Sequence, residues 1–157
     1  MSEIILFTHP TFGVLGILAA VWVTVETLNA SEANAWRIRL AAFACAGTIA
    51  LAWIIGGYWY VTYYAPEKAV ILKGPWPWAH NIFMETKEHL FFIPLILALF
   101  LPIAATQKLA GNRGGRAVVL AVAGLIIVNG LSVEGAGAVI SHGVKVALMH
   151  PGQVGAE

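Results

Sequence analysis

The sequence predicts an all-α integral membrane protein: a bundle of four transmembrane helices that run alternately up and down through the bilayer. Three observations support this prediction. Hydrophobic residues make up 59% of the 157 residues and charged residues only 11%, whereas soluble domains carry about a quarter charged residues. Four mostly apolar segments reach about 20 residues, the length at which a helix spans a bilayer. Polar, Gly-rich or Pro-rich stretches separate these segments.

The chain, residues 1–157, is expected to form a single membrane domain. Its predicted helices occupy residues about 11–29, 38–64, 84–105 and 117–140, and the pattern allows the last helix to continue toward Met149. Ser31 is placed to act as an N-cap of the second helix. A kink is expected near Pro94, because proline removes one backbone hydrogen bond and its ring clashes with the carbonyl of Leu90.

Composition also excludes several classes of protein. The net charge is +1, so the chain lacks the basic face that nucleic acid requires. The one cysteine, Cys45, lies in an apolar run, which excludes disulfides and Cys-based metal sites within one chain and predicts a small buried side chain. The first apolar run lacks a basic leading region and is expected to be a retained helix rather than a signal peptide.

Lysine and arginine in the short connections predict the orientation. The side with the first and third connections carries Arg37, Arg39, Lys108, Arg113 and Arg116, and the other side carries Lys68, Lys73, Lys87 and Lys145. Positive residues favour the cytoplasmic side. We therefore expect an inner-membrane protein of a bacterium with both termini in the periplasm. Glu26, near the basic side, is expected to pair with Arg37 or Arg39.

All five histidines fall on the side opposite to the arginines: His9, His80, His89, His142 and His150. Alternating helices bring His9, His89 and His142 to similar depths, where they form a candidate cofactor or metal site. Glu134 is the most deeply placed charge, and an ionisable residue within a membrane helix indicates function by default.

Haem b is the first interpretation of these histidines, because haem iron takes axial ligands from neutral imidazoles. His9 and His89 lie on diagonal helices and are predicted to hold the ring between them; His89 with His142 is the alternative on adjacent helices. Glu85, Glu88 or Glu134 would accept protons from a quinol. Lys87 is expected to extend toward the membrane interface.

With four spans and His9, His89 and His142 on one side, the chain resembles the small four-helix membrane b-type cytochromes, which pass electrons between quinones and extracytoplasmic cytochromes. The resemblance implies haem b, a quinone, and association with other subunits or with further copies of the chain. It implies an electron-transfer subunit rather than a free-standing enzyme. Such families usually place histidines for one haem near each membrane face, whereas here only the outer half has them, so the haem is expected near the outer face.

Two alternatives stay open. His9, Glu85, His89 and His142 combine nitrogen and oxygen donors that would suit a transition metal without porphyrin. The chain would otherwise be a cofactor-free anchor subunit of a larger complex, with its histidines bonded to lipid headgroups or neighbouring loops.

Overall fold

The structure is a computed structural model that describes residues 2–150, all helical apart from short connections. Its elements are α1 (Ser2–Leu28), α2 (Ala35–Lys73), the π-helix η1 (Ala79–Met84), α3 (Glu85–Leu90), α4 (Phe92–Ala105) and α5 (Arg113–Met149). Four stretches are long and apolar enough to cross a membrane: Ile4–Leu28, Ala35–Lys73, Ala79–Ala105 and Arg113–Met149. The predicted fold class, an all-α bundle of four membrane-spanning helices, is confirmed.

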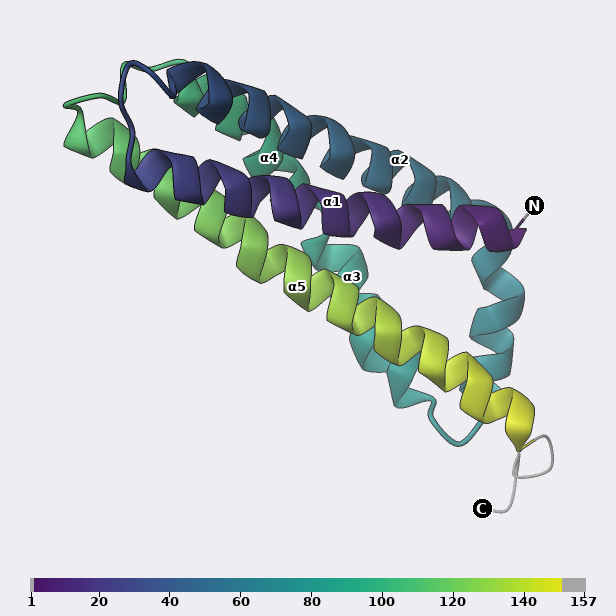
Figure 1. The fold of residues 1–157 in the computed structure, drawn as a ribbon. Helices are drawn as coiled ribbons and strands as arrows, with labels where there is room; N and C mark the ends of the chain where they lie inside the picture. The colour runs from purple at the N-terminus through teal and green to yellow at the C-terminus, as the bar shows by residue number, and fades with distance from the viewer. Residues whose placement is uncertain (1, 151–157) are drawn as a thin grey trace.

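The spans pack as a ring in chain order (Figure 1). α1 packs against α2 and α5, α4 packs against the same two helices, and within the described residues α1 meets neither α3 nor α4. The first and third spans are therefore diagonal, as the up-down-up-down pattern predicts.

One end of the bundle, here called the basic end, holds the connections 29–34 and 106–112 and all four arginines. Glu26 pairs with Arg37 at 3.0 Å, as predicted. The predicted N-cap at Ser31 is wrong, because α2 begins one turn later at Ala35. The buried Asn34 organises this turn: its Oδ1 accepts from the Ser31 backbone N–H, and its Nδ2 donates to both the backbone carbonyl and the carboxylate of Glu26.

Two separate apolar cores run along the molecule. The larger lies toward the basic end between α1, α2, α4 and α5, and it contains the fully buried Cys45. The smaller lies at the far end and is formed by Tyr64, Ile71, Ala79, Met84 and Ile140, with Trp59, Trp76, Phe83, Val139 and Val144 packed against it. Each core is built from different parts of the same long helices, so the bundle has two stacked parts.

Two helices are much longer than a bilayer requires. α2 has 39 residues and α5 has 37, whereas about 20 span the hydrocarbon region. The sequence analysis ended the second helix near residue 64, but Pro66 lies inside α2 and the chain leaves the helix only at Gly74. The predicted continuation of the fourth helix toward Met149 is confirmed. Beyond about residue 60, α2 bends toward the far end of α5 (Figure 1).

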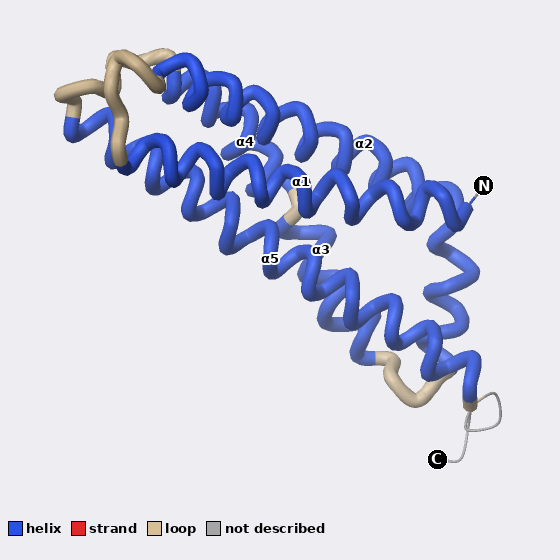
Figure 2. Tube along the Cα trace, viewed as in Figure 1, coloured by secondary structure: helices blue, strands red, loops and turns tan. Residues whose placement is uncertain are grey.

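The third span is built from three pieces. It opens with the π-helix, passes into the short α3, breaks at Phe91 and continues as α4. Figure 2 shows this break as a short loop-coloured segment in the middle of the molecule. Phe91 N still donates to Lys87 O at 3.0 Å, but Pro94 has no N–H to donate to Leu90. The irregularity expected near Pro94 is therefore found.

Candidate functional site

His9 lies on the inner side of α1, against α2. Its Nδ1 is 2.8 Å from the backbone carbonyl oxygen of Ala52. Since a carbonyl only accepts, Nδ1 must carry the proton. The lone pair of Nε2 in the neutral ring can then bind a metal or accept a proton. Gly56 makes room for the ring: a methyl group there would lie 2.5 Å from Cε1 of His9.

Glu134 reaches from α5 toward α1, and its carboxylate contacts Gly13 where a side chain would otherwise stand. Lys87 reaches from α3 toward α5. If Gly137 carried a Cβ, that atom would lie 3.0 Å from Nζ of Lys87. Within the described residues, Lys87 forms no ion pair within 4 Å with either Glu134 or His9. The three side chains form what we call the polar layer: His9, Lys87 and Glu134, one from each of α1, α3 and α5.

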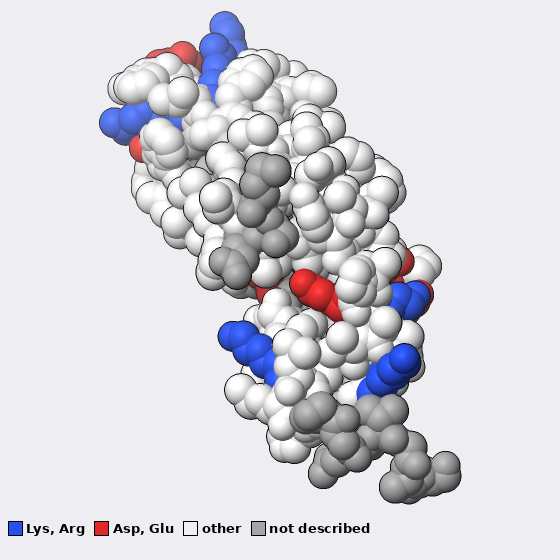
Figure 3. Space-filling model, turned by 90° about the vertical axis from the view of Figure 1, so that its right-hand side faces the viewer, with Lys and Arg blue, Asp and Glu red and all other residues white. Residues whose placement is uncertain are grey.

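The polar layer separates the two apolar cores and lies at a defined depth. About 20 residues of helix separate the basic end of each span from its polar-layer residue, which is His9 on α1, Lys87 on α3 or Glu134 on α5. At the rise of an α-helix this is about 30 Å. This length matches the hydrocarbon thickness of a bilayer. If the basic end lies at one membrane surface, the polar layer lies near the other, and the second core projects beyond it. On the face drawn in Figure 3, charged side chains gather at one end and in a band across the lower part, and the visible surface between them is uncharged.

Lys87 is the member of the polar layer that the sequence analysis placed wrongly, because it turns into the bundle rather than toward the interface. The spacing of Lys87 from Glu85 and His89 already indicated this direction. Two residues along a helix turn about 200°, so Lys87 points almost opposite to both Glu85 and His89. Both of those residues are exposed, whereas Lys87 is partly buried.

A second group of polar side chains joins the far part of α2 to η1 and α3. The Tyr64 hydroxyl lies 2.9 Å from Nδ1 of His80, Nε2 of His80 lies 3.7 Å from Glu85, and the Tyr60 hydroxyl donates to Glu88 at 2.7 Å. His80 precedes the third helix predicted over about 84–105, but it lies in the π-helix and is only 2% exposed. Glu85 and Glu88, the predicted proton acceptors, therefore face Tyr and His partners at the far end of α2.

The three predicted ligand histidines are in different surroundings. His9 is partly buried, whereas His89 is exposed with its Nδ1 bonded to the Glu85 carbonyl at 2.6 Å. His142 is exposed and packs against Trp76, with ring centroids 5.0 Å apart. Within residues 2–150, no group of three or more His, Cys, Asp or Glu side chains is placed to hold a metal ion. The structure thus brings His9 together with Lys87 and Glu134, and brings Glu85 and Glu88 to the second polar group.

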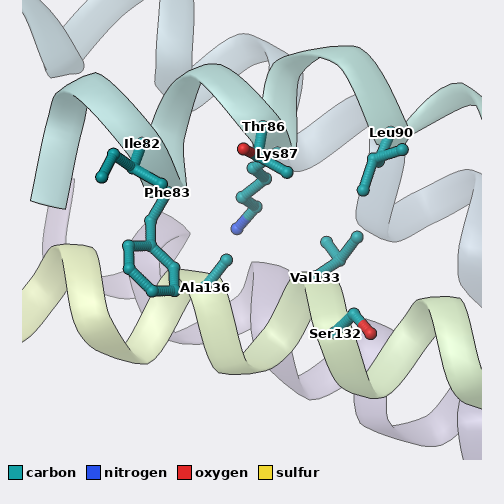
Figure 4. A pocket seen from close by; sticks show the side chains of 8 residues that line it. All are labelled: Ile82, Phe83, Thr86, Lys87, Leu90, Ser132, Val133 and Ala136. Carbon is teal, nitrogen blue, oxygen red and sulfur yellow. The ribbon is translucent and has the colours of Figure 1, made fainter. Parts of the chain in front are cut away.

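A cavity of about 270 Å³ adjoins the polar layer between η1–α3 and α5. Ile82, Phe83, Thr86, Lys87 and Leu90 line one side, and Ser132, Val133 and Ala136 line the other. Figure 4 shows Lys87 crossing from its own helix toward α5, with its ammonium group between Phe83 and Val133. Lys87 is the only charged residue in this lining.

Comparison of the chain with protein-family models, with curated proteins and with solved structures found no match to any of them. The fold and the polar layer therefore carry the functional argument by themselves: the chain is an integral membrane protein with four candidate spans and ionisable side chains from three of them gathered at one depth.

Proposed function

We propose that the chain is the membrane subunit of an electron-transfer complex, which holds haem b near one membrane face and exchanges electrons between the quinone pool and an extracytoplasmic redox partner. His9 is the observation that carries this proposal. It presents a free Nε2 inside the bundle and has its Nδ1 bonded to a backbone carbonyl. Proteins use this pattern to fix the tautomer and orientation of a ligating imidazole.

The residues present suit one axial position of a haem more closely than two. His9 is fixed by Ala52 and accommodated by Gly56. His89 has the same backbone bond at Nδ1 and a free Nε2, and it lies on the diagonal span, but its side chain is exposed. We propose that His9 would hold the haem, and we keep His89 and His142 as the two candidates for a second holding residue. When bound, the haem would supply the one-electron chemistry.

The proposal is tested by haem content in four variants. His9→Ala is expected to lose most of its haem, and His89→Ala and His142→Ala identify the second ligand by the same loss. His150→Ala is the matched control, since His150 is exposed at the end of α5 and its Nδ1 also bonds a backbone carbonyl, that of Val146. Haem per purified chain is read by a pyridine haemochrome assay.

Wild-type haem content in folded His9→Ala would remove His9 as a ligand. Absence of haem from the wild-type chain, expressed with ample haem, would remove the proposal as a whole.

The second candidate function is a cofactor-free anchor subunit, which one observation favours. The far part of the molecule exposes large apolar side chains, with Val61 83%, Leu148 63% and Met149 74% exposed. These positions lie beyond the polar layer, where a partner subunit could cover them. A haem-free chain that co-purifies in fixed ratio with another protein would support this function.

A further inference from the structure

We propose that the cavity between η1–α3 and α5 binds the head group of a membrane-soluble quinone, with Nζ of Lys87 donating a hydrogen bond to one of its carbonyl oxygens. This inference rests on the proposed function and assigns a site to its quinone. The sequence analysis linked quinone chemistry to Glu85, Glu88 and Glu134; Lys87 and this cavity were not part of that assignment.

The first step concerns the Lys87 ammonium group, which has no carboxylate partner within 4 Å among the described residues. The carboxylates that do lie that close to a basic side chain are Glu26, beside Arg37, and Glu85, beside His80. It projects into a cavity whose other lining atoms are mostly apolar (Figure 4). An ammonium group in such surroundings is costly unless it donates hydrogen bonds, so the cavity favours an occupant that carries an acceptor.

The second step is the charge of that occupant. Glu134 belongs to the same polar layer as Lys87, although no ion pair within 4 Å joins them. The formal charges of one lysine and one glutamate cancel, and a fully anionic head group would leave the layer with an excess negative charge. A neutral carbonyl accepts from Lys87 without adding charge. A quinone satisfies this condition and a phosphate or carboxylate amphiphile does not.

The third step is the shape and location of the cavity. Its volume is about 270 Å³, just below the ~300–1,000 Å³ typical of pockets for drug-sized ligands, so it suits a single ring rather than a whole lipid. The Phe83 ring forms one wall. The rim residues Ile82, Thr86 and Ser132 are exposed, so a ligand reaches the cavity from outside the bundle.

The Ser132 hydroxyl gives a polar group on the wall opposite Lys87. It donates to the Val128 carbonyl at 2.9 Å, so its oxygen remains able to accept. It would accept from the hydroxyl of a bound quinol, while Lys87 would donate to the carbonyl of a bound quinone. The site therefore has a polar group for each redox form, and the proposal concerns binding alone.

The test measures binding of decylubiquinone to the purified full-length protein in detergent by equilibrium dialysis. Lys87→Met is expected to weaken binding about tenfold, because it removes a charged donor. Lys87→Arg, which keeps a cationic donor, is expected to retain more affinity than Lys87→Met. Lys145→Met is the matched control, since Lys145 is an exposed lysine of α5 outside the cavity.

A second variant guards against loss of folding. Ala136 is buried in the cavity wall, and Ala136→Phe fills the cavity while leaving every charge in place. It is expected to abolish binding. A photoreactive azidoquinone is expected to label peptides covering 82–90 and 132–136.

Equal affinity of the wild-type chain and both folded variants, Lys87→Met and Ala136→Phe, would overturn the proposal. So would Lys87-dependent binding of decanoate in place of decylubiquinone, because that result would identify an anionic-amphiphile site. The assay needs no haem and no electron donor. Loss of the quinone site therefore leaves the haem proposal standing, and a haem-free protein that binds decylubiquinone leaves this site standing.

Discussion

At the scale of single residues, small side chains determine where the polar groups lie. Gly56 and Gly57 are neighbours on α2 with opposite surroundings: a methyl group at Gly56 would strike the His9 ring, whereas one at Gly57 would meet nothing within 4 Å. The His9 ring lies between α1 and α2 because Gly56 has no Cβ. This pair of glycines gives a matched test of the site.

Gly56→Ala is expected to displace the His9 ring, break its bond to Ala52 and lower the free energy of unfolding by about 1–3 kcal/mol, the usual cost of overpacking a core. Gly57→Ala should leave stability unchanged or slightly higher, since alanine favours a helix. Thermal unfolding of both variants in detergent checks this. Equal melting temperatures for the two would mean that Gly56 does not accommodate His9.

A second residue-scale prediction concerns Lys87 and Glu134. Lys87→Met or Glu134→Gln alone should each destabilise the protein by about 1–3 kcal/mol, because each removes one of the two opposite charges of the polar layer. The double variant should cost less than the sum of both, with a coupling free energy of about 0.5–3 kcal/mol. Denaturant titrations of the four proteins measure it. The control combines Lys87→Met with Glu32→Gln at the basic end, and the changes in unfolding free energy of these two substitutions should add. If the changes for Lys87→Met and Glu134→Gln also added, Lys87 and Glu134 would not be coupled.

Sequence alone identified His9 as a candidate because alternating helices bring it to a depth similar to that of His89 and His142. It identified Glu134 because this is the most deeply placed charge in the spans. It did not identify Lys87 as their partner. The direction in which a long side chain turns depends on the neighbouring helices, and here Gly137 on α5 provides the space. Burial of His80 was missed for a similar reason, since it depends on Tyr64 lying across from it.

At the scale of elements, the break at Phe91 separates the part of the third span that carries Lys87 from the part that packs in the larger core. Pro94 explains the break, whereas Pro66 and Pro102 lie within helices that continue. From the sequence alone, proline predicts a helix break equally at all three positions. Whether a helix continues through a proline depends on the packing of its two halves, which is why the end of α2 was predicted too early.

Pro94→Ala should join α3 and α4 into one helix, because alanine supplies the N–H that Leu90 O lacks. An interior proline costs a helix about 3 kcal/mol or more, so amides near residues 91–95 should exchange with deuterium about tenfold more slowly or slower still. Hydrogen exchange with mass spectrometry measures the rates. Pro102→Ala, within the regular part of α4, should leave exchange at the break unchanged. If Pro94→Ala also left it unchanged, packing rather than proline would cause the break.

At the scale of the whole molecule, α2 and α5 are much longer than a bilayer requires, and the bundle contains two stacked apolar cores. Hydropathy predicts the four spans well, since apolar composition follows directly from contact with lipid. It does not reveal the second core, because Tyr64, Ile71 and Ile140 pack there as apolar residues do in any core. The two-part architecture becomes visible only in three dimensions.

The proposed orientation follows from the lysines and arginines of the connections and is tested by labelling intact cells. Glu32→Cys at the basic end should resist a membrane-impermeant maleimide, and Lys145→Cys at the far end should react. Native Cys45 is fully buried and serves as an internal background. The reverse labelling pattern would place both ends of the described chain in the cytoplasm and would rule out an extracytoplasmic redox partner.

The central claim is that this bundle holds haem b. Its most direct test is a reduced-minus-oxidised absorption spectrum of the detergent-purified protein, expressed with ample haem and checked for folding. We predict a b-type difference spectrum with haem bound at a fixed ratio to the chain. A featureless spectrum from the folded protein would contradict the account and favour an anchor subunit whose activity belongs to its partners.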